Sequence, residues 1–312
     1  MSGSVGKRGI AHKKSTTPVV AALLRRVVHG DSLAAIATLP DACARMIYVD
    51  PPFNTGRTQQ RARVRVTRDE AGERVGFAGA RYRATSLGKG ASYVDRREDE
   101  YVPWLLARLE ASLRCLTADG SLFVHLDARE SHYVKVALDG LLGRSSFINE
   151  IVWAYDYGAR TRRRWPAKHD VILWYARDPQ RYVFDYDAID RIPYLAPQLV
   201  GPEKAARGKT PTDVWWNTIV PTNGREKTGY PTQKPLAILE RLVRVHSAPG
   251  DVVLDFFAGS GTTGEAAARH ERGFVMVDSS RDAIATMRAR LAAWSPEHVR
   301  LPARRGARAP LF

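Results

Sequence analysis

The sequence predicts an α/β fold in which helices cover both faces of a seven-stranded, mostly parallel sheet. Three observations lead to this prediction. Short runs of β-branched and aromatic residues recur along the chain, helical patterns usually separate them, and several runs carry an aspartate at or near their end. The expected strands are residues 27–29, 46–50, 122–126, 151–153, 171–175, 252–256 and 274–278.

Each expected strand is almost continuously apolar, as is typical of a sheet buried on both faces. Two of the intervening segments repeat apolar residues at helical spacing. These residues are Tyr101, Leu105, Leu109, Leu113 and Leu116 in the first segment, and Leu236, Leu239, Val243 and His246 in the second. Because open parallel sheets bind ligands beyond the carboxyl ends of their strands, we expect Asp50, Asp255 and Asp278 to meet there.

The composition indicates a globular chain with a polyanionic partner. The chain has 312 residues, of which 44% are hydrophobic and 26% charged, and its net charge is +15. Such a basic excess points to nucleic acid or to an anionic membrane surface. Residues 1–17 are polar and basic, unlike a signal peptide, and the first apolar run, residues 18–24, is too short to span a membrane. Two cysteines allow one disulfide at most, which is typical of a cytoplasmic protein.

Three segments interrupt the alternation and are interpreted as loops or small inserted subdomains. Residues 57–97 hold eleven Lys or Arg against four Asp or Glu, residues 156–168 are also basic, and residues 185–230 are rich in Pro and Gly. The basic segments are expected to contact phosphates. Trp165, Trp215 and Trp216, which lie in these segments, are expected to pack in the interior rather than to act on a ligand.

Asp50-Pro51-Pro52-Phe53 places a carboxylate, two prolines and an aromatic ring directly after an expected strand. The prolines fix φ and remove two backbone donors, so the Pro51 carbonyl is expected to accept a hydrogen bond. Two acceptors beside an aromatic face suit the amino group of a planar base, because they take its two N–H bonds while the ring stacks. The same residues would equally form a strand end and a proline-ordered turn without a function.

Residues 255–266 have the pattern of a strand end, a glycine turn and a helix N-terminus, where backbone amides face a bound ligand. Gly259, Gly261 and Gly264 match the pattern G-x-G-x-x-G, which leaves a NAD-dependent oxidoreductase open. No lysine follows, and this excludes a Walker-type phosphate loop. Asp278 ends the next strand, 17 residues after Gly261, where a carboxylate can hold ribose hydroxyls.

In these motifs the chain resembles the S-adenosylmethionine-dependent amino-methyltransferases of DNA, in the permuted order called beta class. Residues 50–53 resemble the catalytic motif of members that methylate adenine, whereas members acting on cytosine more often begin this motif with Ser. Residues 255–263 resemble the cofactor loop, and they follow the catalytic motif, as the permuted order requires. Further similar segments are residues 29–32 (His-Gly-Asp-Ser), 149–153, 168–170 and 230–236 (Tyr-Pro-Thr-Gln-Lys-Pro-Leu).

The resemblance implies a Rossmann-like methyltransferase fold with S-adenosylmethionine as the cofactor, and catalytic roles for Asp50, Pro51, Pro52 and Phe53. The cofactor-binding residues that it implies are Asp31, Lys234, Asp255, Phe257, Gly259, Ser260, Gly261, Thr262, Thr263 and Asp278. Phe53 departs from the family pattern, in which Tyr is commoner, but it preserves stacking. Phe256 stands where Pro is frequent, and no consequence for the chemistry is expected.

The expected catalytic domain covers residues 18–295, between a flexible basic N-terminus (1–17) and a basic tail (296–312). Within it, residues 57–97 and 156–228 are expected to be inserted segments for target recognition, and residues 229–295 to bind the cofactor. The residues expected to bind DNA are Arg57, Arg160, Arg162, Arg163, Arg164 and Lys168.

The expected reaction is direct methyl transfer from S-adenosylmethionine to the exocyclic amine of adenine, on a base flipped out of double-stranded DNA. No metal is expected, because no His or Cys spacing matches a zinc site. Methylation of ring carbon 5 of cytosine would need a cysteine after a proline. Cys43 follows Ala42 and Cys115 follows Arg114, so both are expected to be small buried apolar residues.

Three alternatives stay open: transfer to the exocyclic amine of cytosine, a NAD-dependent oxidoreductase, and a DNA-binding protein without activity. The expected partners are double-stranded DNA, a cognate restriction endonuclease and a second copy of the chain, with no membrane. The expected location is the cytoplasm, in association with the nucleoid through DNA binding.

Overall fold

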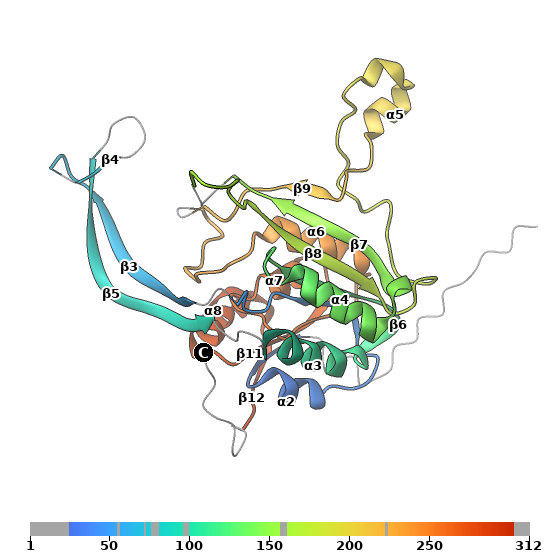
Figure 1. Cartoon of the computed structure of the whole chain (residues 1–312), viewed down its shortest axis with the longest axis horizontal. Coiled ribbons are helices and arrows are strands. Elements are labelled where there is room, and N and C mark those ends of the chain that lie inside the picture. Colours follow the sequence, from blue (N-terminus) through green and yellow to red (C-terminus); the bar gives the residue numbers. More distant parts are fainter. Residues whose placement is uncertain are drawn as a thin grey trace, which may run out of the picture.

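The computed structural model describes residues 25–54, 57–71, 73–75, 81–95, 100–156, 161–221 and 224–302. Its centre is a nine-stranded sheet that contains all seven expected strands (Figure 1). In spatial order the strands are β12 (Glu297–Arg300), β1 (Arg25–His29), β11 (Gly273–Asp278), β10 (Val252–Asp255), β2 (Ala44–Val49), β6 (Leu116–Leu126), β8 (His169–Ala176), β7 (Phe147–Ala154) and β9 (Val214–Trp216). Only β8 runs antiparallel to its neighbours, so the predicted mostly parallel α/β sheet is confirmed.

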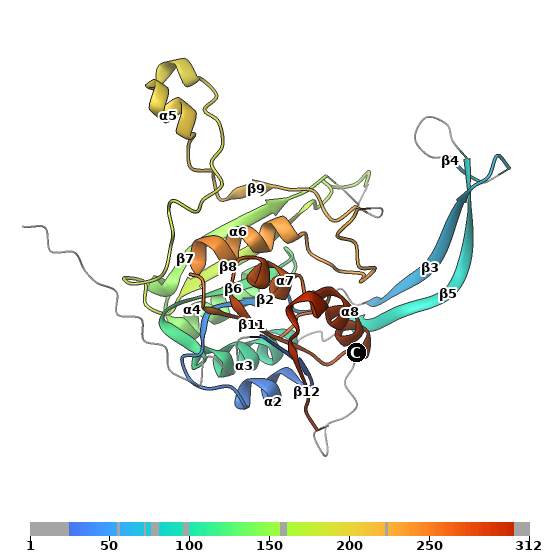
Figure 2. The same cartoon turned by 180° about the vertical axis from the view of Figure 1, so that it is seen from behind.

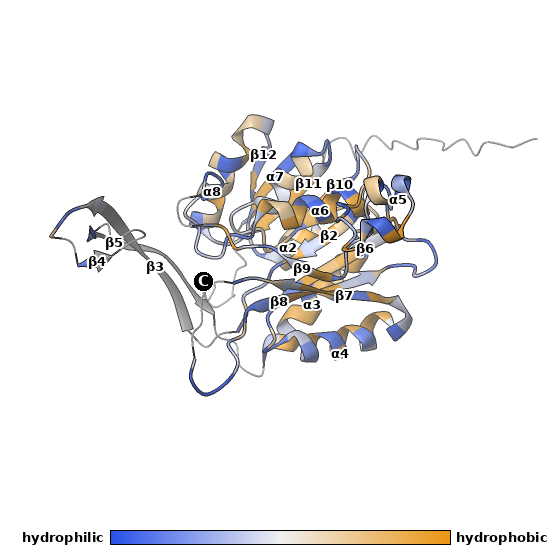
Figure 3. Ribbon diagram, turned by 90° about the horizontal axis from the view of Figure 1, so that it is seen from above, coloured by the Kyte–Doolittle hydropathy of each residue, from blue (hydrophilic) through white to orange (hydrophobic). Residues whose placement is uncertain are grey.

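Helices cover both faces of this sheet (Figures 1 and 2). One face carries α2 (Ser32–Ala37), α3 (Tyr101–Leu113) and α4 (Ser131–Leu142), and the other carries α6 (Leu236–His246), α7 (Thr262–Arg269) and α8 (Arg281–Leu291). Strand β2 shows why its sequence is continuously apolar. Ile47 and Val49 join the apolar cluster of α2 to α4, whereas Met46 and Tyr48 join that of α6 to α8. Figure 3 shows that hydrophobic positions (orange) are concentrated in the strands of the central sheet and recur along the helices that cover it.

The insertion at residues 57–97 forms a small antiparallel sheet. β3 (Arg57–Arg68) pairs with β5 (Arg81–Asp95), and the short β4 (Arg74–Val75) pairs with one end of β5. This ribbon begins four residues after Phe53, the last residue of the Asp50–Phe53 motif, and extends away from the body (Figure 1). The two strands satisfy each other's backbone groups, so the ribbon forms without the apolar period that marks a buried strand.

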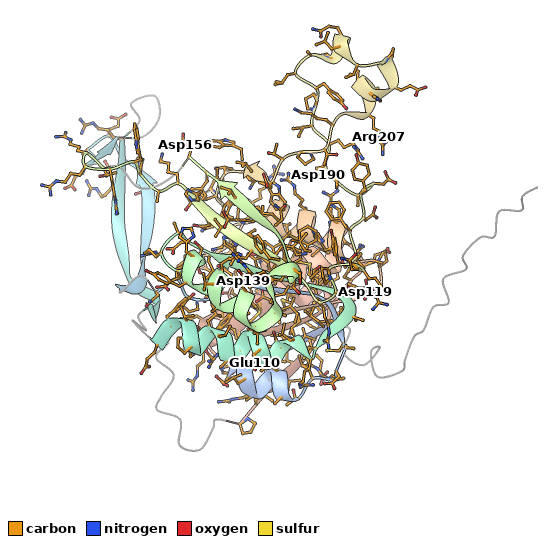
Figure 4. All side chains as sticks on the ribbon, turned by 45° about the vertical axis from the view of Figure 1, so that its right-hand side comes forward. Glu110, Asp119, Asp139, Asp156, Asp190 and Arg207 are labelled. Carbon is orange, nitrogen blue, oxygen red and sulfur yellow. The ribbon has the colours of Figure 1, made fainter. Side chains whose placement is uncertain are left out.

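Residues 177–213 lie at the edge of the sheet where the parallel strands begin, because β8 ends and β9 starts at that edge. The 3₁₀ turn Pro197–Leu199 and α5 (Pro202–Arg207) form an arm that projects from the body there (Figure 1). Asp190 ties the base of this arm to α6 by pairing with Arg241 and Arg244 (Figure 4). The middle of the segment expected to recognise the target therefore lies at the amino edge, opposite to the strand-end aspartates.

Some expectations need correction. The basic tail does not begin at residue 296, because β12 pairs in parallel with β1 and the Leu301 N–H bonds to the His29 carbonyl (3.0 Å). The described part of the chain does not include the rest of the expected tail, residues 303–312, or the expected N-terminal segment, residues 1–17. Trp165 and Trp216 are not interior residues, since they are 94% and 74% exposed. Trp215 does pack against the apolar cluster of α6 to α8.

Two further observations concern the cysteines and the helices of the described residues. Cys43 and Cys115 are buried and carry free thiols, as expected of small apolar residues. No helix in the described part of the chain has the length and apolar character needed to cross a bilayer.

Candidate active site

Four aspartates stand at the carboxyl ends of neighbouring parallel strands and line one cavity. Asp31, Asp278, Asp255 and Asp50 end or follow β1, β11, β10 and β2. The empty space among these residues is about 1020 Å³, a volume that includes open solvent at the mouth of the cavity. All four residues expected to be catalytic line this cavity, and so do nine of the ten expected to bind the cofactor.

The motif Asp50 to Phe53 forms one wall of the cavity. After it, Asn54 adopts a left-handed conformation (φ 54°), and its amide donates to Glu130 (2.7 Å), which fixes the turn toward the ribbon. Lys234 lies against the motif: its Nζ is 2.9 Å from Oδ1 of Asp50 and 4.5 Å from the centre of the Phe53 ring. No sequence pattern indicated this ion pair, because it joins positions 184 residues apart.

The glycine loop owes its shape to two residues with positive φ, Gly259 (49°) and Gly261 (75°). A Cβ on Gly261 would lie 2.7 Å from Cγ of Met287, so this glycine lets the start of α7 approach α8. Gly261 itself is not among the residues that line the cavity. A Cβ on Gly264 would lie 2.9 Å from Cγ of Met276, so the third glycine allows α7 to pack closely on β11.

Asp255 is a buried carboxyl group held by the loop that follows it. It accepts hydrogen bonds from the Phe257 N–H (2.9 Å) and the Thr263 hydroxyl (2.7 Å). Burial raises the pKa of Asp255 to about 7, and the charges of Asp50 and Asp278 contribute to the rise while the two hydrogen bonds oppose it. Asp255 therefore organises the loop and exchanges a proton near neutral pH.

Asp278 and Asp31 present carboxylates to the same cavity from β11 and β1. Asp278 accepts from the backbone N–H groups of Gly259 (2.9 Å) and Ser280 (2.8 Å), and burial raises its pKa. Asp31 caps α2 by accepting from the Ala34 N–H (3.1 Å). Each carboxylate oxygen has a second lone pair, so both groups can still accept hydrogen bonds from a ligand.

Trp104 and Arg108 complete this wall of the cavity, and the sequence did not identify them. The Trp104 and Phe257 rings lie with their centres 5.4 Å apart, and the Arg108 guanidinium lies 4.4 Å from the centre of the Trp104 ring. Arg108 also donates to Ser32 (2.8 Å) and Asp31 (3.3 Å). The two residues are one helical turn apart on α3, beside the apolar stripe that predicted the helix, and this spacing is the signal that could have found them.

A buried chain of polar groups lies next to the Asp50–Phe53 motif, with the His125 ring centre 6.0 Å from that of Phe53. The Tyr48 hydroxyl is 2.7 Å from Nδ1 of His125, the His125 Nε2 is 3.3 Å from Asp170, and the Tyr155 hydroxyl donates to the second Asp170 oxygen (3.2 Å). Because an ionised carboxylate only accepts, Nε2 donates and Nδ1 accepts from Tyr48. Burial raises the pKa of Asp170, but the His125 bond, the Lys234 charge and the Tyr155 bond outweigh it, so its pKa is lowered.

The structure describes five of the six residues that are expected to bind DNA. Arg162, Arg163 and Arg164 are exposed in the connection between β7 and β8, which lies at the carboxyl edge of the sheet with the cavity. At the same connection Lys168 pairs with Asp156 (2.6 Å; Figure 4). The backbone of Arg57 begins β3, and Arg160 lies outside the described residues. Across the described residues, no three His, Cys, Asp or Glu side chains gather in a way that could hold a metal ion.

Solved structures with this fold include DNA methyltransferases. The PvuII cytosine-N4-specific DNA methyltransferase superposes with a TM-score of 0.60 at 17% identity, over 85% of this chain and 86% of that one. The complex of M1.HpyAVI with S-adenosylmethionine superposes with a TM-score of 0.54 at 21% identity, over 85% of this chain and 98% of that one. At these identities the likeness establishes the fold.

Sequence relatives extend the comparison. The type II methyltransferase M.ScaI of Streptomyces caespitosus is 27% identical over 271 residues, which are 81% of this chain and 77% of the relative. The DNA adenine methyltransferase YhdJ of Escherichia coli (strain K12) is 27% identical over 273 residues, 83% of this chain and 80% of the relative. A family model described as DNA methylase, for N6 and N4 methyltransferases, matches residues 44–288. The chain therefore belongs to the DNA methylase family.

Proposed function

We propose that this chain transfers a methyl group from S-adenosylmethionine to the exocyclic amine of adenine in double-stranded DNA. One observation carries the proposal: the motif Asp50 to Phe53 lines the same cavity as the glycine loop and Asp278, so a base amine and a methyl donor can meet there. Membership of the DNA methylase family supports the reaction class and leaves the NAD-dependent oxidoreductase without support. The aspartate at position 50 and the similarity to a DNA adenine methyltransferase favour adenine.

The residues of the cavity fit S-adenosylmethionine. Trp104 and Phe257 offer aromatic faces to its purine, while Asp31 and Asp278 offer acceptors to its amine and hydroxyl groups. The glycine loop exposes backbone at the N-terminus of α7, where a Cβ on Gly259 would lie 3.2 Å from the Tyr230 ring. When bound, this cofactor supplies a methyl group on a positively charged sulfur.

Asp50 and the Pro51 carbonyl are proposed to accept the two N–H bonds of the base amine while Phe53 stacks on the base. The amine is a poor nucleophile, because its lone pair is delocalised into the ring. The two acceptors orient it and stabilise the positive charge that grows on its nitrogen, effects that each lower a barrier by several kcal/mol. After transfer the nitrogen carries one proton in excess, and the carboxylate of Asp50 is placed to accept it. No covalent intermediate with the protein is needed.

A base inside a duplex must be flipped out to reach this cavity, at a cost of a few kcal/mol. Stacking on Phe53, worth about 1–3 kcal/mol, offsets part of that cost. The exposed side chains of Arg162, Arg163 and Arg164 are proposed to bind phosphates beside the cavity. The β3–β5 ribbon is proposed as a second DNA contact, since a two-stranded ribbon fits the major groove.

The remaining partners belong to the same proposal. A cognate restriction endonuclease is proposed because M.ScaI is named a type II methyltransferase. A second copy of the chain is proposed from the family resemblance. The proposed place of action is the cytoplasm, on the DNA of the nucleoid.

The test is to incubate the protein with tritiated S-adenosylmethionine and DNA from a strain lacking DNA methyltransferases, then digest the DNA and separate its nucleosides. We expect the label in N6-methyladenine. Label in N4-methylcytosine would replace adenine with cytosine as the target while preserving the reaction class. Label in RNA or protein with none in DNA would contradict the proposal.

A further inference from the structure

Lys234 connects the glycine loop with the catalytic motif. Its backbone carbonyl accepts a hydrogen bond from the Thr262 hydroxyl (3.3 Å) at the start of α7, and its mostly buried side chain reaches Asp50. The preceding residue, Gln233, is 7% exposed and accepts two hydrogen bonds from the backbone and hydroxyl of Thr228. The backbone of Lys234 is therefore fixed, and its ammonium is held beside Asp50.

Lys234 also stands between two cavities. Lys234 and Thr232 line both the cavity described above and a second cavity, whose other walls include Trp153, Tyr155 and Asp170. Asp50 belongs to the first cavity and Asp170 to the second. The Lys234 charge contributes to the lowered pKa of Asp170, so this one ammonium interacts with both carboxylates.

The ammonium lies against the two groups that the proposed reaction needs. It is 2.9 Å from Oδ1 of Asp50, whose carboxylate would bond the base amine, and 4.5 Å from the centre of the Phe53 ring, on which the base would stack. A cation at this position would also oppose the positive charge that grows on the amine nitrogen. Movement of the ammonium away from Asp50 would free this carboxylate for a base, and Asp170 is the carboxylate in the wall of the second cavity.

We propose that Lys234 is a positioning residue of the target-base site, whose ammonium neutralises Asp50 and passes to Asp170 when the base amine binds. This inference rests on the proposed function, because it requires a base amine at Asp50. It differs from the cofactor-binding role that the family resemblance implies for Lys234. Without the ammonium, Asp50 in the first cavity and Asp170 in the second have no cation between them, which disfavours the charged acceptor that the amine needs.

Lys234→Met tests the role of the charge, because it removes the ammonium and keeps an unbranched side chain. Binding of S-adenosylhomocysteine, measured by calorimetry, is expected to change less than threefold. Methyl transfer to unmethylated DNA at saturating S-adenosylmethionine is expected to fall at least tenfold at pH 6.5. The loss should be smaller at pH 8.5, because high pH ionises the carboxylates without help from a cation.

The pH comparison depends on the other titratable groups around Lys234. They include Tyr48 and Asp50 at β2, His125 on β6, Tyr155 after β7, Asp170 on β8, Lys227 and Tyr230 in the segment before α6, Asp255 on β10, Asp278 on β11, Asp31 after β1 and Arg108 on α3. Asp255, with its pKa of about 7, titrates within the measured range. The quantity to compare is therefore the ratio of variant to wild-type rate at each pH, because Asp255 is present in both proteins.

Two further variants serve as controls. Lys234→Arg preserves the charge and is expected to retain at least a third of the wild-type rate. Lys135→Met removes a lysine that pairs with Asp139 (2.6 Å) on α4, and it is expected to leave both measurements unchanged. Tenfold weaker binding of S-adenosylhomocysteine with an unchanged saturated rate would assign Lys234 to the cofactor and overturn the inference. A rate loss equal at both pH values and not restored by Arg would also overturn it.

Asp170→Asn tests the second half of the inference, with thermal unfolding and S-adenosylhomocysteine binding as checks on folding. If Asp170 acts by receiving Lys234, the double variant with Lys234→Met should be no slower than the slower single variant. Multiplied losses would show that the residues act separately and would overturn the transfer between carboxylates. A wild-type protein that methylates no DNA would instead contradict the proposed function.

Discussion

Asp50 is the single residue on which the proposed chemistry depends most, because it supplies a charged acceptor at the reacting nitrogen. Asp50→Ala is expected to lower methyl transfer at least 10²–10³-fold, the usual loss when one transition-state hydrogen bond is removed. Binding of S-adenosylhomocysteine and of DNA should persist, since other residues carry them. Asp127→Ala is the matched control: this aspartate follows β6 at the same edge of the sheet and pairs with Arg129. Undiminished turnover of Asp50→Ala would exclude the proposed role.

Asp255 links the site to the stability of the fold through its proton. Its pKa is about 7 in the folded protein against an ordinary value of 3.8, so the folded state binds more protons between these pH values. Raising the pH through this window therefore lowers the free energy of unfolding. Asp255→Asn has no proton to lose, and its thermal midpoint should decline less than that of the wild type between pH 5 and 8. Parallel midpoint curves, measured by calorimetry, would disprove this.

At the scale of elements, the start of α7 depends on a glycine that no other residue replaces without strain. Gly261 has φ 75°, and a Cβ there would lie 2.7 Å from Cγ of Met287. Gly261→Ala is expected to lower the free energy of unfolding by about 1–3 kcal/mol and to weaken binding of S-adenosylhomocysteine, because the loop must shift. Denaturant unfolding and calorimetry measure the two effects.

Gly140 in α4 provides the control for this substitution. A Cβ at Gly140 would meet nothing within 4 Å, and alanine is favoured over glycine in a helix by roughly 1 kcal/mol. Gly140→Ala should therefore leave the cofactor affinity unchanged and the fold at least as stable. Equal destabilisation by both substitutions would refute the specific role of Gly261.

The elements that sequence reasoning found are those whose side chains are buried on both faces. All seven apolar runs became strands, and the periodic segments became α3 and α6. The two additional strands, β9 and β12, lie at the ends of the sheet and are mostly exposed. β9 is apolar but only three residues long, and β12 carries no apolar run. The β3–β5 ribbon was not predicted for a related reason, since its strands pair with each other outside the core.

The candidate site also contains features that the sequence predicted and features that it did not. The aspartates at strand ends were predictable, because parallel topology alone brings them to one edge. The pair of Lys234 with Asp50 and the chain from Tyr48 through His125 to Asp170 were not, because they depend on which strands become neighbours. Tyr48 and His125 also stand within apolar runs, where the periodicity predicts core packing and nothing more.

At the scale of the whole molecule, a net charge of +15 does not identify the side that binds DNA, so we base the proposed side on the topology of the sheet. The cavity and the residues Arg162, Arg163 and Arg164 share the carboxyl edge, whereas the α5 arm starts from the amino edge. Replacing these three arginines with serine should weaken DNA binding and reduce the salt dependence. The slope of log K against log salt should fall by about 0.9 for each phosphate that the variant no longer neutralises.

The α5 arm offers a control with the same change of net charge. Lys204, Arg207 and Lys209 carry three positive charges on the arm (Figure 4 labels Arg207), at the edge away from the cavity. Their replacement with serine should leave the slope close to that of the wild type, because only cations near phosphates release counterions on binding. Fluorescence anisotropy with labelled duplex DNA between 50 and about 200 mM salt measures both variants. An equal fall in slope for the two triple variants would mean that DNA binding depends on overall charge, and that the edge carrying the cavity is not the DNA-binding side.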